Sequence, residues 1–156
     1  MKIVASVMCA LTVLVTNPVS AADGLITMKS SFDAKETMDR MEKTLRDKGM
    51  TIFERIDHAA GAEKIGKALR PTEVLLFGNP KAGTPFIECA QTVGIDLPMK
   101  TLVWKDASGQ VWLGYNDPAF LTKRHGAPEC GVVGGMSKTL DGLAREALRQ
   151  VKDSAT

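Results

Sequence analysis

The sequence predicts one α+β domain, a two-layer unit in which helices cover one face of a mainly antiparallel sheet. Residues 97–104 and 110–115 are strand-like segments joined by Asp106–Gly109, a turn suited to a β-hairpin and not to a parallel crossover. Amphipathic helical patterns flank this strand-rich middle at residues 33–48 and 137–151. A chain of 156 residues without linkers or internal repeats favours a single domain.

The N-terminal residues are typical of a secretory signal peptide. Lys2 is positively charged, and Ile3–Val15 is apolar apart from one serine and one threonine. This run is too short to cross a hydrocarbon core of roughly 30 Å, which takes about 20 residues. We therefore expect a signal peptide over residues 1–21, with cleavage after Ala21 or Ala22.

The remaining domain, residues 25–152, has the composition of a globular protein. Apolar residues make up 44% of the chain and charged residues 24%. The formal net charge is only +2, which is not the basic footprint of a nucleic-acid-binding protein. No later segment is apolar enough to span a membrane. We expect a periplasmic or secreted protein without a nucleic-acid partner and without a stable membrane span after signal cleavage.

Strand and helix signals alternate along the domain. The clearest helix start is Asp33, which can cap the helix with Glu36 as its capping-box partner, and Gly49 ends that helix. The predicted strands cover residues 25–30, 50–56, 72–77, 97–104 and 110–115. The predicted helices cover residues 33–48, 58–67, 85–93, 118–124 and 137–151.

Two strand features give specific expectations about packing. The strand over residues 50–56 alternates only moderately, with Ile52 and Ile56 on one face and Phe53 on the other. Trp104 and Trp112 flank the hairpin turn, and we expect them to pack on the sheet or on each other.

Gly78–Pro85 is predicted as a loop, with Thr84 as N-cap and Pro85 as the first residue of the following helix. Gly78 and Gly83 have the spacing of the two glycines in a nucleotide-binding P-loop. Thr84 and Pro85 then replace the lysine and the Ser/Thr that such a loop needs, which argues against nucleotide binding. Backbone amides near Lys81 remain candidates for a small anion, although we favour a purely conformational role for the glycines and prolines.

The cysteines predict a pair. Removal of Cys9 with the signal peptide leaves Cys89 and Cys130, and an even pair in an oxidising compartment can form a disulfide. The alternative is two separate thiols, with Cys89 as a small buried side chain on a helix.

The two histidines, His58 and His125, adjoin helix ends and are the candidate ligands if the chain holds a metal ion. Neither HxxxH nor CxxC spacing is present, and the absence of CxxCH excludes covalently attached c-type haem. The alternative is two hydrogen-bonded structural histidines. No GxSxG or similar nucleophile motif is present, so we expect no catalysis.

Several motifs together resemble the domain-of-unknown-function family 302. They are IDHAAGA at residues 56–62, LFGNPKAGTP at 76–85, GIDLPMK at 94–100, the Val103–Trp104 pair and YNDP at 115–118. The resemblance implies strands and helices in β-α-β4-α order, a topology similar to the TATA-binding-protein-like fold, and a homodimer. A shared fold carries no implication of DNA binding. The motif positions kept as candidate ligand-binding residues are Asp57, His58, Asn79, Lys81, Thr84, Tyr115, Asn116, Asp117 and His125.

These observations give three functional hypotheses. The first is a non-enzymatic ligand-binding or accessory protein for an unidentified small molecule or protein, with a site where Gly78–Pro85 meets His58, Tyr115–Asp117 and His125. The second is a metal- or haem-binding accessory protein in periplasmic redox or metal homeostasis. The third is a small hydrolase or isomerase with a histidine as general base. The sequence assigns no cofactor.

Overall fold

The computed structural model describes residues 22–150, so the predicted signal peptide lies outside the described residues. In this range the chain forms a five-stranded antiparallel sheet with the strand order β1-β5-β4-β3-β2. The elements are β1 (Leu25–Ser30), α1 (Ala34–Asp47), β2 (Thr51–Asp57), α2 (His58–Glu63), β3 (Thr72–Gly78), α3 (Pro80–Cys89), the 3₁₀ helix η1 (Gln91–Ile95), β4 (Met99–Lys105), β5 (Val111–Asn116), α4 (Pro118–Arg124) and α5 (Val133–Leu148).

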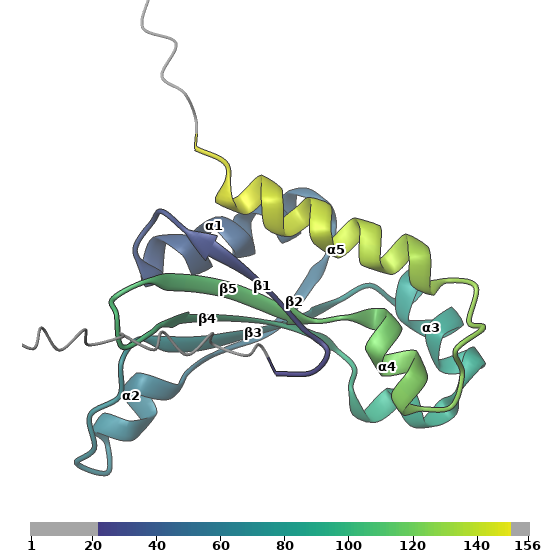
Figure 1. Ribbon diagram of the computed structural model, residues 1–156, viewed down its shortest axis with the longest axis horizontal. Coiled ribbons are helices and arrows are strands. Elements are labelled where there is room, and N and C mark those ends of the chain that lie inside the picture. Colours follow the sequence, from purple (N-terminus) through teal and green to yellow (C-terminus); the bar gives the residue numbers. More distant parts are fainter. Residues whose placement is uncertain (1–21, 151–156) are drawn as a thin grey trace, which may run out of the picture.

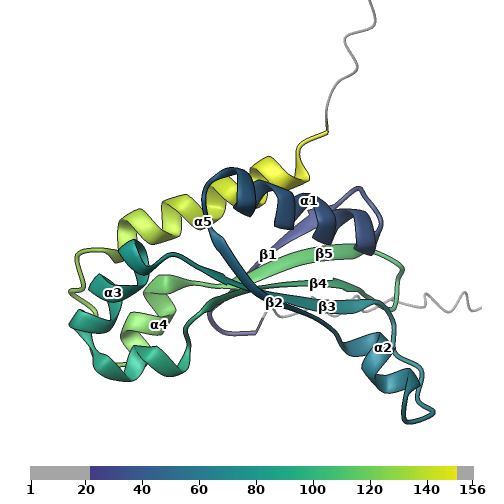
Figure 2. The same cartoon turned by 180° about the vertical axis from the view of Figure 1, so that it is seen from behind.

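The two long helices, α1 and α5, pack against each other on one face of the sheet (Figures 1 and 2). The core is formed by apolar side chains from α1 and α5, from the facing side of the strands and from the shorter helices, including α3. Its most deeply buried large members are Phe77, Phe86, Met38, Met41, Leu45, Leu75 and Leu113. The predicted α+β class and the β-α-β4-α order are therefore confirmed.

The helix α1 follows its sequence signals. Asp33 Oδ1 accepts a hydrogen bond from Glu36 N–H at 2.8 Å, which satisfies one of the free amides of the first turn. Gly49 ends the helical segment with a φ of 74°, a left-handed conformation that glycine adopts without a steric penalty. Local chemistry alone is sufficient to place this helix.

The β4–β5 hairpin also forms as predicted. Gly109 N–H donates to the Asp106 carbonyl at 3.1 Å, and Trp104 and Trp112 stack with their ring centroids 6.2 Å apart. Hydrogen bonds from the Ser108 hydroxyl and from Trp112 Nε1–H lower the pKa of Asp106 to about 2. The turn is thus held by a carboxylate as well as by its backbone.

The strand β2 contains an irregularity that reverses one prediction. Its pairing with β3 shifts between Ile52 and Glu54, which marks a β-bulge. Because a bulge adds one residue to one strand, the alternation resets, and Ile56 lies on the face opposite Ile52. The same reset turns Arg55 toward α1, where it pairs with acidic side chains, and leaves Phe53 56% exposed.

The helix α3 begins five residues earlier than the sequence predicts. Asn79 is the N-cap, since its Oδ1 accepts from Lys81 N–H at 2.9 Å, and Pro80 is the first helical residue. Asn-Pro has the same cap-and-proline chemistry as the predicted Thr84-Pro85 pair, and it comes first along the chain. Pro85 therefore lies inside the helix.

The helix α5 also begins earlier than predicted, at Val133 instead of Ser137. The glycines before Ser137 indicated a loop because glycine disfavours helix. In the structure Val133 N–H donates to the Cys130 carbonyl and Met136 N–H donates to the Val132 carbonyl, at 3.2 and 3.0 Å. These bonds extend the helix through the glycine-rich segment.

Candidate functional site

A cleft of about 750 Å³ lies at the end of the sheet where α3 faces the first turns of α5, and we call it the apolar cleft. This volume is within the range of roughly 300–1,000 Å³ that is usual for small-molecule sites. Its lining is apolar or glycine apart from an asparagine, two threonines and one lysine: Met50, Phe53, Phe77, Gly78, Asn79, Pro80, Lys81, Ala82, Gly83, Thr84, Pro85, Ile87, Leu97, Pro98, Met99, Gly131, Val132, Gly135, Met136, Thr139 and Leu140.

Glycines open the space that the cleft occupies. A Cβ atom at Gly78 would lie 3.3 Å from the Phe53 ring, so glycine lets the end of β3 approach that side chain. Gly131 and Gly135 are four residues apart at the start of α5, and a Cβ atom at either position would meet nothing within 4 Å. The glycine-rich segment therefore gives α5 a wall with little side-chain volume facing α3.

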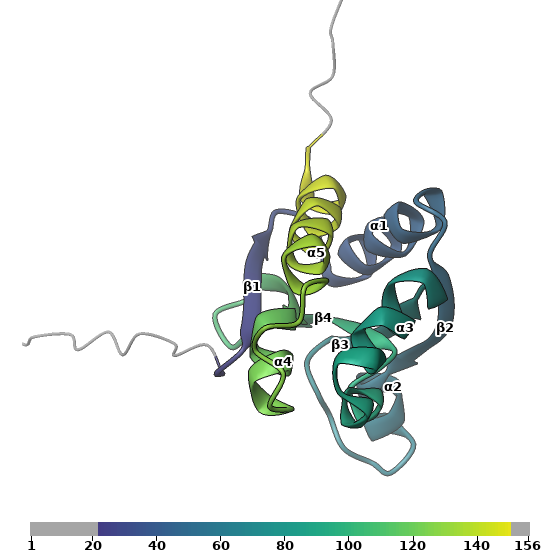
Figure 3. The same ribbon diagram turned by 90° about the vertical axis from the view of Figure 1, so that its right-hand side faces the viewer.

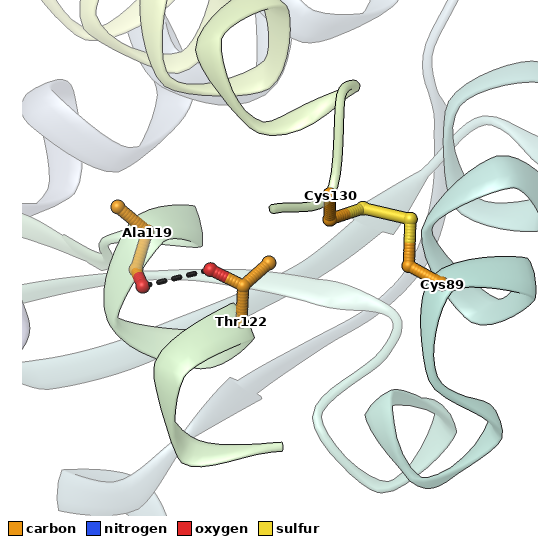
Figure 4. Close-up of a disulfide and its surroundings, with 4 residues drawn as sticks. All are labelled: Cys89, Ala119, Thr122 and Cys130. Atoms are coloured by element: carbon orange, nitrogen blue, oxygen red, sulfur yellow. Dashed lines mark hydrogen bonds between the residues drawn. A yellow bond between two sulfur atoms is a disulfide. The ribbon is translucent and has the colours of Figure 1, made fainter. Parts of the chain in front are cut away.

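A disulfide joins the two sides of the cleft. Cys89, the last residue of α3, is bonded to Cys130, which lies just before α5, with a Cα–Cα distance of 5.7 Å. Figure 4 shows this bond beside α4, in which the Thr122 hydroxyl donates to the Ala119 carbonyl at 2.9 Å. The pairing that the sequence left open is therefore present, and it fixes α3 relative to the start of α5.

The start of α3 does not offer free amides to an anion. Asn79 Oδ1 accepts from Lys81 N–H, and the Asn79 carbonyl accepts from Ala82 and Gly83 N–H, both at 2.9 Å. Pro80 has no N–H at all. These amides are consequently not available to an anion, contrary to the prediction. The Lys81 ammonium remains the positive group of α3 in the cleft.

Lys81 is exposed and forms no ion pair within residues 22–150. It is also the only charged residue among those that line the cleft. The first turn of α5 has no side-chain cap, and the amides of Gly134 and Gly135 donate to no acceptor in the described part of the chain. The cleft therefore combines apolar walls with a small positive region.

Asp57 and His58 lie away from the cleft. Asp57 Oδ1 accepts from Ala60 N–H at 2.9 Å and caps α2, while His58 is exposed at the start of that helix. The strand β3, with 7 residues, separates α2 from α3, a length of roughly 20 Å at 3.3 Å per residue. The two helices consequently lie at opposite ends of the sheet (Figure 1), and His58 does not meet Lys81.

His125 is engaged in a separate polar cluster. Its Nε2 lies 2.6 Å from Asp96 Oδ2, and its Nδ1 lies 2.9 Å from Thr92 Oγ1. Arg124 Nη1 also contacts Asp96, at 3.1 Å. Thr92, Asp96 and His125 do not line the apolar cleft, so this cluster joins the end of α4 to η1 and lies outside the cleft.

The Tyr115–Asp117 turn is structural in its contacts. Asp117 Oδ1 accepts from Ala119 N–H at 3.0 Å and caps α4. Asn116 pairs with Leu25 at the edge of the sheet. Tyr115 is buried, and this burial, together with the nearby charges of Asp141 and Asp117, raises its pKa.

Of the nine candidate residues, the structure places Asn79, Lys81 and Thr84 in one cleft. Sequence reasoning missed the opposite wall, including Gly135, Met136 and the segment Leu97–Met99. No local motif marks Gly135 or Met136, and Leu97–Met99 lie in the GIDLPMK motif at residues 94–100 but were not among the candidate site residues, because the cleft is assembled from segments that are distant in the sequence. The four-residue spacing of Gly131 and Gly135 could have indicated this wall, but residues 127–136 were predicted as a loop, in which such spacing has no meaning.

Metal ligation finds no support in this geometry. Within residues 22–150, no group of three or more His, Cys, Asp or Glu side chains could hold a metal ion. Both Cys89 and Cys130 are used in the disulfide. Over the same range, no helix has the length and apolar character that crossing a membrane would need.

Known proteins resemble parts of this chain. The "Fluoride-specific ion channel FluC 1" of Brucella suis biovar 1 (strain 1330) is 46% identical over 102 residues, which are 65% of this chain and 40% of the channel protein. The "Fluoride-specific ion channel FluC 2" of Brucella melitensis biotype 1 is 46% identical over 102 residues, 65% of this chain and 38% of that protein. The matched segment is thus well under half of each of these relatives.

The fold also matches a solved structure. The crystal structure of a conserved DUF302 protein from Bacillus stearothermophilus superimposes with a TM-score of 0.73 and 22% sequence identity, covering 82% of this chain and all of the other. The family model for the domain of unknown function DUF302 matches residues 26–147. The chain therefore belongs to the DUF302 family.

Proposed function

We propose that this protein binds a small apolar molecule in the apolar cleft and does not catalyse a reaction on it. The observation that carries the proposal is the composition of a cleft of about 750 Å³, in which apolar side chains and glycines predominate. Transfer of an apolar ligand from water to such walls is favourable in proportion to the area that becomes buried. A few polar groups at the edge are the usual means of orienting such a ligand.

The absence of catalysis is inferred from the position of the reactive side chains. The polar groups that line the cleft are Asn79, Lys81, Thr84 and Thr139, which form no nucleophile–base pair among the hydrogen bonds of the described chain. The one histidine–carboxylate contact among residues 22–150, His125 with Asp96, lies outside this lining. General acid–base chemistry requires such a group within hydrogen-bond reach of the substrate.

A pair of glycine substitutions tests the proposal. Gly135 lines the cleft and Gly134 does not, while a Cβ atom at either position would meet nothing within 4 Å. We expect Gly135→Leu to fill the cleft and to weaken the binding of a dye that fluoresces in apolar surroundings by at least about tenfold. Gly134→Leu is the matched control and should bind the dye like the wild type.

The two glycine variants also distinguish loss of binding from loss of folding. Circular dichroism and the unfolding midpoint should be similar for both, because a Cβ atom at either position would meet nothing within 4 Å. Equal dye binding by Gly135→Leu and Gly134→Leu would show that the dye does not use the cleft and would contradict the proposal.

We further propose that the protein is exported and acts in an oxidising compartment. The Cys89–Cys130 bond supports this, because disulfides persist mainly in such compartments. Fractionation of the native host, with the mature N-terminus identified by mass spectrometry, tests both the location and cleavage after Ala21 or Ala22. The homodimer implied by the family resemblance is tested by sedimentation of the same purified protein.

The Brucella relatives favour a second candidate function, that of an accessory protein to a fluoride channel. The observation is the 46% identity over 102 residues to proteins named fluoride-specific ion channels. We propose that this chain acts beside such a channel and supplies no permeation path itself.

Growth in fluoride tests this second function. Deletion of the gene from its host should lower the fluoride concentration that stops growth, and the wild-type gene should restore it. Unchanged tolerance in the deletion strain would contradict the channel-associated function while leaving ligand binding by the cleft as a separate question.

A further inference from the structure

We infer that the ligand of the apolar cleft is an amphiphile with a single anionic head group, such as an alkyl carboxylate, whose head lies at Lys81. This inference rests on the proposed function and assigns the chemical class of the ligand. The evidence is the charge distribution around the cleft, which contains one cation and no anion among all its lining residues.

The first step of the argument concerns what Lys81 contacts. Its side chain lines the cleft, is exposed, and forms no salt bridge within the described range. Two lysines on α1, by contrast, are neutralised by a neighbour: Lys35 Nζ lies 2.6 Å from Asp39, and Lys43 Nζ lies 2.6 Å from Asp47. Lys81 is therefore free to pair with a charge that the ligand brings.

The second step concerns the rest of the ligand. Apart from Lys81, Asn79 and two threonines, the walls are formed by glycines and by apolar side chains such as Phe77, Leu97 and Met136, which offer few hydrogen bonds to a polar ligand. A buried polar group without a partner is costly, so these walls select against a ligand with several polar groups. One charged head and an apolar tail match both features of the cleft.

A third feature adds to the positive region. Within residues 22–150 the amides of Gly134 and Gly135 donate to no acceptor, and Gly135 lines the same cleft. The N-terminal end of a helix favours a negative charge through its dipole. The same end disfavours a cationic head group, so we expect affinity to fall from an anionic to a neutral to an alkylammonium ligand with the same tail.

Three ligands with the same ten-carbon chain test the assignment: decanoate, decanol and decyltrimethylammonium, all kept below their micelle concentrations. Affinity is measured by displacement of the apolar dye and checked by native mass spectrometry. We expect decanoate to bind about fivefold more tightly than decanol, because an exposed ion pair contributes up to about 1 kcal/mol. Added salt should weaken only decanoate binding.

Lys81→Gln is the decisive variant. It should bind decanoate about fivefold more weakly than the wild type while its affinity for decanol stays unchanged. Lys138→Gln is the matched control, because Lys138 is exposed on α5, forms no salt bridge in the described chain, and does not line the cleft. Its affinity for decanoate should remain that of the wild type.

The outcomes separate this inference from the proposed function. Equal affinity for decanoate and decanol, or tighter binding of decyltrimethylammonium, would overturn the anionic head group and leave an apolar ligand site intact. An equal effect of Lys81→Gln and Lys138→Gln would also overturn it. Failure of all three ligands to displace the dye, with no dye binding by the wild type, would overturn the proposed function itself.

Discussion

The two ends of the sheet contain hollows of similar size and opposite chemistry. The apolar cleft, of about 750 Å³, lies between α3 and α5. At the other end, a recess of about 930 Å³ is lined largely by polar and charged residues, and we call it the charged recess. Its lining is Ser31, Phe32, Asp33, Ala34, Lys35, Arg55, Asp57, Ala59, Pro71, Glu73, Lys105, Gly109 and Val111. The end-on view in Figure 3 looks at the molecule from the end that carries α3 and α4.

Most charges of the recess are already matched within the protein. Arg55 Nε lies 2.6 Å from Glu73 Oε2, and Arg55 Nη1 lies 2.6 Å from Asp39 Oδ1. Burial lowers the pKa of Arg55, but the hydrogen bonds to Glu73 and Asp39 outweigh it and leave this pKa raised. In the apolar cleft, by contrast, the single cation has no partner in the described chain. Whether the polar groups of a hollow already have partners within the protein therefore indicates ligand binding better than the volume of the hollow does.

Loss of the disulfide should have the largest effect and should act at the apolar end. Cross-linking residues with a sequence separation of 41 stabilises by about 4 kcal/mol in the chain-entropy treatment. We expect the double variant Cys89→Ala and Cys130→Ala to lose about this much free energy of unfolding, measured with urea. Hydrogen exchange should increase in α3 before it increases in α1.

The control for this prediction is chemical reduction. A reductant should destabilise the wild type to a similar extent and should not affect the double alanine variant. A double variant as stable as the oxidised wild type would mean that the bond does not determine the stability of the apolar end.

Substitution of Arg55 should have the next largest effect and should act at the charged end. Arg55→Met leaves Asp39, Glu42 and Glu73 without their shared cation, at a cost of about 2 kcal/mol for this partly buried cluster. Arg46→Met is the matched control, because Arg46 pairs with Glu42 on the exposed surface and should contribute less than about 0.5 kcal/mol.

If these two arginine variants unfold at the same urea concentration, the ion pairs of Arg55 do not stabilise the charged end more than an exposed surface pair does. Arg55→Met should also bind decanoate and the apolar dye like the wild type, because the charged recess and the apolar cleft share no lining residue. A large loss of ligand binding in this variant would mean that the two ends are coupled.

The smallest effect is expected at Asp106, in the hairpin turn beside the charged recess. Its folded-state pKa of about 2 is below the unfolded value, so its ionised form stabilises the fold above about pH 4. This stabilisation is lost as the pH falls through about 2. Asp106→Asn should be less stable than the wild type at pH 7, and the difference should shrink between pH 4 and pH 2. A difference that stays constant over this range would assign the effect to hydrogen bonding and not to charge.

The fold was predictable wherever a local signal determines it. Asp33 with Glu36 specifies a helix start, and Asp106 with Gly109 specifies a hairpin turn, through contacts between residues that are close in sequence. The start of α3 was predicted wrongly because two adjacent cap-and-proline pairs compete, and the sequence does not rank them. The bulge in β2 depends on its pairing with β3, which single-strand alternation cannot reveal.

The candidate site was predictable on one side only. The motif around Lys81 marked the α3 wall of the cleft, since glycines and prolines are local signals of a turn between elements. The α5 wall depends on tertiary packing and on the disulfide to Cys130. His58 and His125 were grouped with Lys81 because all three belong to family motifs, but shared membership of a motif set does not determine proximity in space.

The bond between Cys89 and Cys130 divides the chain into a closed covalent ring and two open arms. The ring contains β4, β5 and α4, whereas β2, β3 and α1 belong to the N-terminal arm. A protease cut inside the ring leaves one covalent molecule until a reductant is added. A cut in the exposed segment 64–70, between α2 and β3, instead yields two fragments with no covalent link, which are joined by the antiparallel pairing of β2 with β3 and of β1 with β5 and by the core. Denaturing gels with and without reductant therefore distinguish the two kinds of cut. Fragments cut inside the ring separate only with reductant, whereas fragments cut at residues 64–70 separate on both gels.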